Sequence, residues 1–190
     1  MAGSSEAKRL DTKRIWEGRK FAIDVDRVRL PHGREASLEM VRHPGSVVLV
    51  PMPDPQHVIL VRQYRYAAGA FLWELPAGSL EPGETIEACA RRECHEEIGL
   101  VPALLQNLGT FYPSPGFLTE TMTFFLCAEL REPTEEAAQD EDEHIEPRTV
   151  SLAQIDAMVA RGDIVDMKTI VGVDRVRALA KRDHEQTRRT

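Results

Sequence analysis

The sequence has no long apolar run. None of its 190 residues lies in a stretch approaching the roughly 20 apolar residues that a membrane-spanning helix needs. The first part of the chain, MAGSSEAKRLDTKRIWEGRK, also lacks the apolar segment of a secretory signal peptide. These absences predict a soluble cytoplasmic protein that makes no use of a membrane.

Cysteine is also scarce. The three cysteines, Cys89, Cys94 and Cys127, form no dense framework, and their odd number is typical of a reducing compartment. Cys89, Cys94 and His95 lie close together in sequence, but their spacing differs from that of a zinc module. We expect the cysteines either to pack as small apolar side chains or to lie exposed, without a chemical role.

Positive charge is in deficit, because 24 Lys and Arg stand against 31 Asp and Glu, a net charge of −7. This balance argues against a general affinity for nucleic acid or for an anionic membrane surface. An anionic substrate would therefore need local help from arginine or from a metal ion. The 42% of hydrophobic residues suffices for one domain with a substantial core.

The pattern of apolar residues divides the chain into an arm and a main domain. Residues 1–12 are polar and predict a flexible leader. Residues 13–44 alternate apolar and polar side chains on both sides of PHGR, which indicates a β-hairpin. Residues 45–183 are predicted to form the main domain, and residues 184–190 a frayed tail.

Within the main domain the expected strands outnumber the expected helices. Helices are predicted over residues 84–98, from the capping pair Ser151 and Gln154 to Gly162, and over residues 167–182. Strands are predicted at SVVLVPM, HVILVRQYRY, FLWELPAG, LGTFYP, TETMTFFLCAEL and RTVS. Because strands and helices do not alternate regularly, the sequence predicts an α/β fold with a mixed sheet flanked by helices.

The helix expected over residues 84–98, in GETIEACARRECHEEIGL, carries charge on its apolar side. At about 100° per residue, three small apolar residues lie within about 80° of Ile86 and form a stripe. Glu93 and Glu97 lie within about 20° of Ile86, on the same stripe. A carboxylate that faces the interior is costly unless it is paired or bound to metal.

Three arrangements would stabilise these carboxylates: an ion pair with Arg91 or Arg92, a position in an open cleft, or a bound divalent cation. Glu93, Glu96 and Glu97 converge on one patch of helix surface, and their hard oxygen atoms suit Mg²⁺ or Mn²⁺. The alternative is a solvated acidic face with ordinary ion pairs. The preceding loop ELPAGSLEPGE favours the metal, because its glycines let the backbone approach a ligand closely.

Residues 78–100 resemble the Nudix box. That motif has a glycine, five residues, a glutamate, seven residues, Arg-Glu, an aliphatic residue, any residue, Glu-Glu, any residue, a glycine and an aliphatic residue. The matching positions are Gly78, Glu84, Arg92, Glu93, Cys94, Glu96, Glu97, Gly99 and Leu100. Only Cys94 departs from the motif, which usually has Ile, Leu or Val there, and its small apolar side chain preserves the packing role.

The resemblance implies the Nudix fold, an α/β/α sandwich with a mixed central sheet, here extended by the N-terminal β-hairpin element. It also implies hydrolysis of a nucleoside diphosphate linked to another group. Arg92 would pair with Glu84 and steady the turn between loop and helix. Mg²⁺, or Mn²⁺ in its place, would be bound by the backbone carbonyl of Ala77 and by the carboxylates of Glu93, Glu96 and Glu97.

Features outside the box resemble the ADP-ribose pyrophosphatase branch of the family. These are WELPAG at residues 73–78 and YPSPGF, which includes Pro115. The hairpin of residues 13–44 resembles the element through which members of that branch pass a strand to a partner. The resemblance therefore implies a homodimer.

The same resemblance implies substrate contacts outside the box. Arg65, in RQYR, would contact the diphosphate, and Pro115 would lie near the substrate. Phe21 would stack on adenine, with an ordinary core position as the alternative. Glu120 would approach the ribose, with the start of a surface strand as the alternative.

The acidic stretch AAQDEDEHIEP would supply the general base. On its own the stretch reads as a solvated charge run. In the enzymes it resembles, a glutamate of this loop closes over the site, and the match favours Glu141 with Glu143 as second choice. A base on a mobile loop activates water only once substrate and metal are in place.

The expected reaction is hydrolysis of ADP-ribose to AMP and ribose 5-phosphate. One alternative is a Nudix hydrolase for GDP-mannose, another nucleoside-diphosphate sugar or NADH. The other is a non-catalytic module that binds ADP-ribose for regulation. Modules of that kind usually lose carboxylates of the box, whereas all of them are present here.

Overall fold

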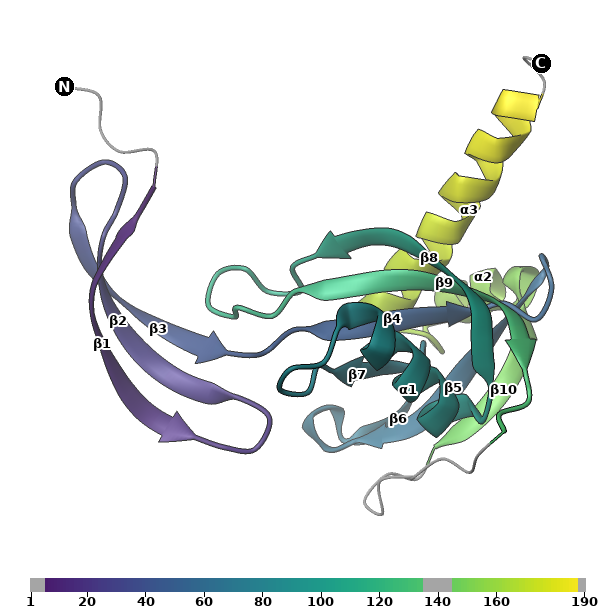
Figure 1. Cartoon of the computed structure of the whole chain (residues 1–190), viewed down its shortest axis with the longest axis horizontal. Coiled ribbons are helices and arrows are strands. Elements are labelled where there is room, and N and C mark those ends of the chain that lie inside the picture. The colour runs from purple at the N-terminus through teal and green to yellow at the C-terminus, as the bar shows by residue number, and fades with distance from the viewer. Residues whose placement is uncertain (1–5, 135–144, 188–190) are drawn as a thin grey trace. The chain divides into compact units, whose positions relative to one another are not determined.

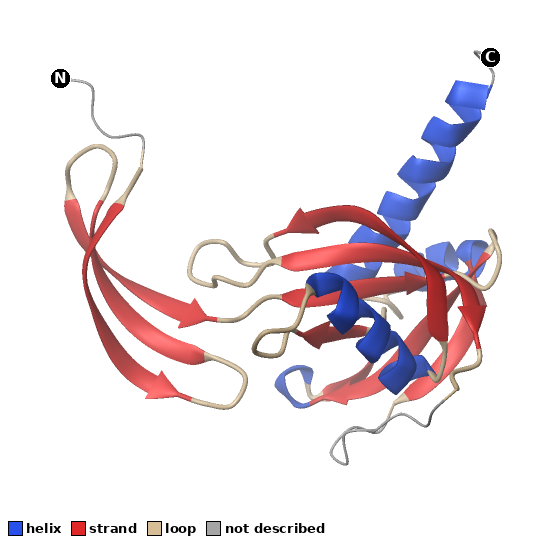
Figure 2. Ribbon diagram, in the orientation of Figure 1, coloured by secondary structure: helices blue, strands red, loops and turns tan. Residues whose placement is uncertain are grey.

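The computed structural model describes residues 6–134 and 145–187, the last five of these by their backbone alone. The chain separates into two compact units, which are described one at a time (Figures 1 and 2). Unit 1 contains the chain up to Gly45 together with Phe111–Met122. Unit 2 contains Ser46–Thr110 and the chain from Thr123 onward.

Unit 1 is built on an antiparallel three-stranded sheet of order β1-β2-β3. Its strands are β1 (Lys8–Glu17), β2 (Ala22–Arg29) and β3 (Glu35–Arg42). Strands β2 and β3 lie on either side of the expected turn, but β1 begins inside the predicted leader of residues 1–12. The leader prediction was wrong at this point because β1 is exposed along almost its whole length and shows little apolar alternation.

Polar pairs, rather than apolar burial, bind β1 to its neighbour. Asp24 and Asp26 are only 3% and 6% exposed. The Thr12 hydroxyl donates to Asp26 at 2.8 Å, and the Arg14 and Arg42 guanidinium groups both bond Asp24. These buried carboxylates are therefore satisfied by cations and hydroxyls from the flanking strands.

The segment Phe111–Met122 belongs to unit 1 because it pairs with β3. The Val41 N–H donates to the Phe117 carbonyl at 2.8 Å, and the Thr119 N–H donates to the Val41 carbonyl at 3.0 Å. A parallel bridge joins Val41 and Leu118. The loop that contains Pro115 is thus fixed by backbone hydrogen bonds to the end of β3.

Unit 2 contains two sheets, of orders β7-β4-β9-β8 and β10-β5-β6. Strands β4 and β7 are antiparallel, whereas β4 and β9 run in the same direction (Figure 1), so the four-stranded sheet is mixed. A 3₁₀ turn at Tyr66–Ala68 joins β5 to β6. The strands are β4 (Ser46–Pro51), β5 (His57–Arg65), β6 (Ala70–Glu74), β7 (Ala77–Ser79), β8 (Val101–Phe111), β9 (Met122–Arg131) and β10 (Glu146–Ser151).

Three helices complete the described part of unit 2: α1 (Ile86–Ile98), α2 (Leu152–Arg161) and α3 (Met167–Thr187). Helix α1 begins two residues later than expected because the Thr85 side chain caps it by accepting the Ala88 N–H. The predicted capping box of Ser151 and Gln154 is present at α2. Helix α3 continues to Thr187, beyond the predicted end at residue 182.

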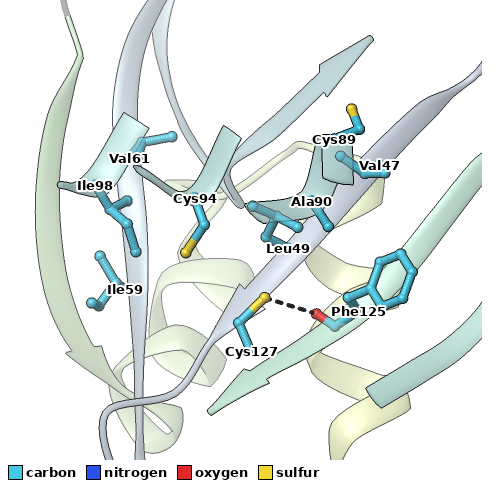
Figure 3. Packing of buried hydrophobic residues seen from close by; sticks show 10 residues of the cluster. All are labelled: Val47, Leu49, Ile59, Val61, Cys89, Ala90, Cys94, Ile98, Phe125 and Cys127. Carbon is cyan, nitrogen blue, oxygen red and sulfur yellow. Dashed lines mark hydrogen bonds between the residues drawn. The ribbon is translucent and has the colours of Figure 1, made fainter. Parts of the chain in front are cut away.

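Strand β4 forms the centre of unit 2 and is buried along its whole length. Val47 and Leu49 on one face join the core cluster that contains α1 residues (Figure 3). On the other face, Val50 lies beside Gly172 of α3. Helices therefore cover both faces of this sheet, which confirms the predicted α/β/α sandwich.

The three cysteines are free and buried, as expected for small apolar side chains. Cys94 of α1 and Cys127 of β9 lie in the core cluster, where the Cys127 thiol approaches the Phe125 carbonyl (Figure 3). Ile86 does not pack in the core as the periodicity indicated, because it is the first residue of α1 and is 38% exposed. No described helix is long and apolar enough to span a membrane.

Candidate active site

Arg92 fixes the turn between the glycine-containing loop and α1. Its Nε and Nη2 atoms donate to the two carboxylate oxygens of Glu84 at 2.9 and 3.0 Å. Nη2 also donates to the Ser79 carbonyl at 3.2 Å. This bidentate pair ties the loop residue Glu84 to the second turn of the helix, so the two segments hold one arrangement.

The carboxylates of the box occupy the buried side of α1. Glu93 and Glu97 are only 9% and 8% exposed, as the periodicity predicted. The Glu93 carboxylate lies directly against Gly78, where a Cβ at position 78 would stand 1.8 Å from the Glu93 Cδ. Glycine at this position therefore makes room for the carboxylate.

Arg92 also holds two of these carboxylates. Its Nη1 atom donates to Glu93 Oε1 at 2.7 Å and to Glu96 Oε2 at 2.8 Å. Glu97 turns the other way, and its Oε1 accepts the Ala77 N–H at 3.4 Å. The ion-pair arrangement that the sequence left open is thus present, with Arg92 rather than Arg91 as the partner.

This arrangement bears on metal binding. In residues 6–134 and 145–187, no group of three or more Asp, Glu, His or Cys side chains is arranged so that it could hold a metal ion. One oxygen of Glu93 and one of Glu96 accept from Arg92, whereas Oε1 of Glu97 accepts from Ala77. A metal ion bound by these carboxylates would compete with Arg92 for the oxygens of Glu93 and Glu96.

The donor chemistry nevertheless fits a hard divalent cation. The Leu49 N–H of β4 donates to the Pro76 carbonyl, so the next residue, Ala77, points its N–H and its carbonyl away from β4. The Ala77 N–H meets Glu97 on that side. One backbone carbonyl and three carboxylates are all oxygen donors, which Mg²⁺ and Mn²⁺ prefer.

The electrostatics of the turn keep Glu84 ionised and Cys89 protonated. Hydrogen bonds from Arg92 hold the pKa of Glu84 below its usual value and outweigh the opposing effect of burial. Burial, reinforced by the negative charges of Glu84 and Glu93, raises the pKa of the Cys89 thiol to about 12. At neutral pH the Cys89 thiol is therefore protonated, which disfavours it as a nucleophile.

A second set of charges surrounds Arg65. Its Nε and Nη2 atoms donate to the two oxygens of Glu74 at 2.9 and 2.7 Å. Glu74 is 2% exposed and also accepts the Lys168 ammonium. No motif of the sequence marks Glu74 or Lys168, although an acidic residue between Trp73 and Leu75 in FLWELPAG is a signal of a buried carboxylate.

The other residues predicted at the substrate lie in unit 1. Phe21 is 42% exposed and packs against Trp16 with ring centroids 5.2 Å apart, so it is not an ordinary core residue. Pro115 is exposed in its loop. Glu120 lies with its carboxylate 3.7 Å from His43 Nδ1. Glu141 and Glu143 lie outside the described residues.

Comparisons with known proteins place these observations in a family. The chain is 35% identical to an ADP-ribose pyrophosphatase of Bacillus subtilis over 90% of its length and 92% of the relative. It is 36% identical to an ADP-ribose pyrophosphatase of Mycobacterium tuberculosis over 90% and 83% of the two chains. A methanol dehydrogenase activator of Bacillus methanolicus is 33% identical over 88% and 91%.

The fold has a counterpart among solved structures. The crystal structure of an ADP compounds hydrolase matches 94% of this chain and 96% of its own with a TM-score of 0.78, at 20% identity. Residues 42–169 match the family described as NUDIX domain. The span of that match contains the Arg92-clamped turn, the carboxylates of α1 and most of the sandwich around them, and the chain belongs to the Nudix family.

Proposed function

We propose that this protein is a divalent-metal-dependent hydrolase that cleaves the diphosphate of ADP-ribose into AMP and ribose 5-phosphate. The observation that carries the proposal is the buried carboxylate face of α1, formed by Glu93 and Glu97 beside Gly78. Chemistry on a diphosphate needs charge neutralisation in a chain of net charge −7. The substrate rests on the ADP-ribose pyrophosphatases that align with almost the whole chain.

The proposed metal is Mg²⁺, with Mn²⁺ as a substitute. Its ligands would be the Ala77 carbonyl, Glu93, Glu96 and Glu97. When bound, the metal would lower the pKa of water and neutralise charge that develops on the diphosphate. Arg92 keeps the carboxylates close together until then, because its guanidinium balances two of them.

The chain's own residues bind and orient the substrate. Arg65 would contact the diphosphate through its guanidinium, which is 39% exposed as a side chain. Phe21 would stack on adenine across a homodimer. Pro115 and Glu120 would contact the substrate as well. Glu141, or else Glu143, would accept a proton from the attacking water.

A substrate panel tests the proposal. The purified protein is incubated with Mg²⁺ and with ADP-ribose, GDP-mannose, NADH and other nucleoside-diphosphate sugars, and the products are identified by chromatography. We expect AMP and ribose 5-phosphate, with the highest kcat/KM for ADP-ribose. A higher kcat/KM for another member of the panel would contradict the substrate assignment.

Three variants test the assigned residues. Glu97→Gln keeps the shape of the side chain but removes a charged ligand, so activity should fall by at least about a hundredfold. Glu141→Gln and Glu143→Gln show which glutamate is the general base, and we expect the larger loss of activity in Glu141→Gln. Full activity of Glu97→Gln would contradict the ligand set. Binding of ADP-ribose without any product would instead indicate a regulatory module.

A further inference from the structure

We propose that Glu74 and Lys168 are positioning residues that hold the Arg65 guanidinium in place for the substrate diphosphate. The inference builds on the proposed function, since it takes Arg65 as the residue that contacts the diphosphate. Neither Glu74 nor Lys168 belongs to the Nudix box, and Lys168 lies 94 residues after Glu74. Their role follows from a buried network that joins β5, β6 and α3.

The network lies on the α1 side of its sheet. Ile59 and Val61 of β5 pack in the same core cluster as α1. Arg65 points to that side as well, because it follows Val61 by four residues and side chains alternate along a strand. Glu74 is the cross-strand partner of Val61 and shares the same face. Arg65 and Glu74 thus belong to the sheet face that α1 covers.

The pair fixes the orientation of the guanidinium. Both Glu74 oxygens accept from Arg65, at 2.9 and 2.7 Å, which sets the plane of the guanidinium as well as its position. Glu74 is 2% exposed as a side chain, whereas Arg65 is 39% exposed. The inner edge of Arg65 is therefore anchored, and its outer part is presented to solvent.

Lys168 ties this pair to the start of α3. Its ammonium bonds Glu74 and lies 3.2 Å from Asp166, and its side chain is only 10% exposed. The Thr169 N–H and hydroxyl donate to Asp166 at 2.9 and 2.6 Å. The Thr169 hydroxyl in turn accepts the Leu75 N–H at 2.8 Å. The residue after Glu74 and the residue after Lys168 are thus bonded to each other.

The charges explain why both cations are needed. Burial raises the pKa of Glu74, but hydrogen bonds and charge from Arg65 and Lys168 outweigh burial and keep the carboxylate ionised. Lys168 shares the balancing of Glu74 with Arg65 and also faces Asp166, so the effect of Glu74 on Arg65 is to orient its guanidinium toward the diphosphate. A cation held in place before the substrate arrives loses no free energy to reorganisation.

A double-mutant cycle separates positioning from general stability. In the parent protein, Glu74→Gln should lower kcat/KM by about 10–100-fold, because Arg65 loses its anchor. In the Arg65→Ala background, the same change should have almost no further effect on kcat/KM. Equal losses in both backgrounds would overturn the inference, because Glu74 would then act without Arg65.

Further variants guard against loss of the fold. Glu74→Asp keeps the charge but shortens the anchor, so it should reduce kcat/KM only where Arg65 is present. Lys168→Arg should retain most of the activity that Lys168→Met loses. The control is Asp156→Asn, which removes an exposed ion pair with Arg177 and should leave kcat and KM unchanged.

The test does not depend on ADP-ribose being the substrate. The same cycle is measured on the Kd of ADP by calorimetry, which requires no turnover. Weaker ADP binding in Glu74→Gln, absent in the Arg65→Ala background, would support positioning whatever the substrate panel shows. Equal weakening of ADP binding in both backgrounds would contradict the positioning role. The proposed reaction is tested separately, by the product analysis of the substrate panel.

Discussion

The carboxylate of Glu93 fills the space that a side chain at position 78 would need. A Gly78→Ala change places Cβ 1.8 Å from the Glu93 Cδ, yet the obstacle is only the far end of a flexible side chain. Glu93 can therefore move aside while the fold survives. We expect a loss of about a hundredfold in kcat with a change in unfolding free energy of no more than about 1 kcal/mol.

Kinetic assays and thermal unfolding of Gly78→Ala test this expectation together. A variant with normal kcat would show that Glu93 has no role in turnover. A variant that is mainly unstable would show that the glycine serves packing alone.

The Arg92–Glu84 pair predicts a loss of stability in acid. The pKa of Glu84 is lowered from 4.5 in the folded protein. Its contribution is therefore complete above pH 4.5 and is lost as the pH falls through the lower folded pKa. At pH 7, Glu84→Gln should cost roughly 1.5–3 kcal/mol of unfolding free energy, and the difference from the parent protein should shrink below pH 4.5.

Urea unfolding between pH 7 and pH 3.5 measures that difference. Glu129→Gln is the control, since it removes an exposed pair with Arg131 and should change stability little at any pH. A difference for Glu84→Gln that is constant over the whole range would contradict the role of the ion pair.

The positions of some site residues could be predicted from the sequence, and those of others could not. The side of α1 that Glu93 and Glu97 occupy followed from helical periodicity, and the resemblance indicated the pairing of Arg92 with Glu84. The burial of Glu74 had a local signal in FLWELPAG, but its partner Lys168 lies 94 residues further on, so no local pattern could reveal the network.

Among the elements, α3 depends on a close approach at Gly172. A Cβ there would stand 2.4 Å from Leu75 Cδ1 and 3.2 Å from Val50 Cγ2. Alanine favours a helix by about 1 kcal/mol over glycine, but overpacking typically costs about 1–3 kcal/mol. We therefore expect Gly172→Ala to destabilise the protein, although its intrinsic helix propensity rises.

Denaturant unfolding of Gly172→Ala determines which effect is larger. Its kcat at a temperature well below unfolding should match that of the parent protein, in contrast to Gly78→Ala. Higher stability would mean that α3 can shift away from Leu75 at little cost.

Most helices and strands could be predicted from the sequence. The errors at β1 and at the end of α3 have physical causes. An apolar run predicted the buried strand β4, and the capping box predicted the start of α2. Strand β1 was missed in part because backbone pairing and ion pairs hold it, not an apolar face. The end of α3 was underestimated because polar helix ends carry little periodic signal.

At the scale of the whole molecule, metal binding should stabilise the folded chain. A ligand at a hundred times its Kd contributes about 2.7 kcal/mol, which corresponds to a rise in Tm of about 5–10 °C for a chain of this size. We expect a saturable rise with Mg²⁺ or Mn²⁺, measured by thermal unfolding without substrate. The rise should be strongly reduced in Glu97→Gln.

Glu87→Gln is the matched control on the same helix, because Glu87 is exposed in the first turn of α1. It should keep the full metal-dependent rise in Tm. An equal rise in Glu97→Gln would show that the stabilising ion binds elsewhere.

The segment Phe111–Met122 lies between two strands of unit 2 but pairs with β3 of unit 1. The chain consequently passes from one unit to the other three times rather than once. Because unit 1 consists of two separate stretches of the chain, recombination at a single junction could not exchange the whole unit between relatives. A chimera that replaced only the residues before Ser46 would pair a foreign β3 with the native segment Phe111–Met122. The backbone hydrogen bonds between Val41 and Thr119 would then join segments from two different proteins.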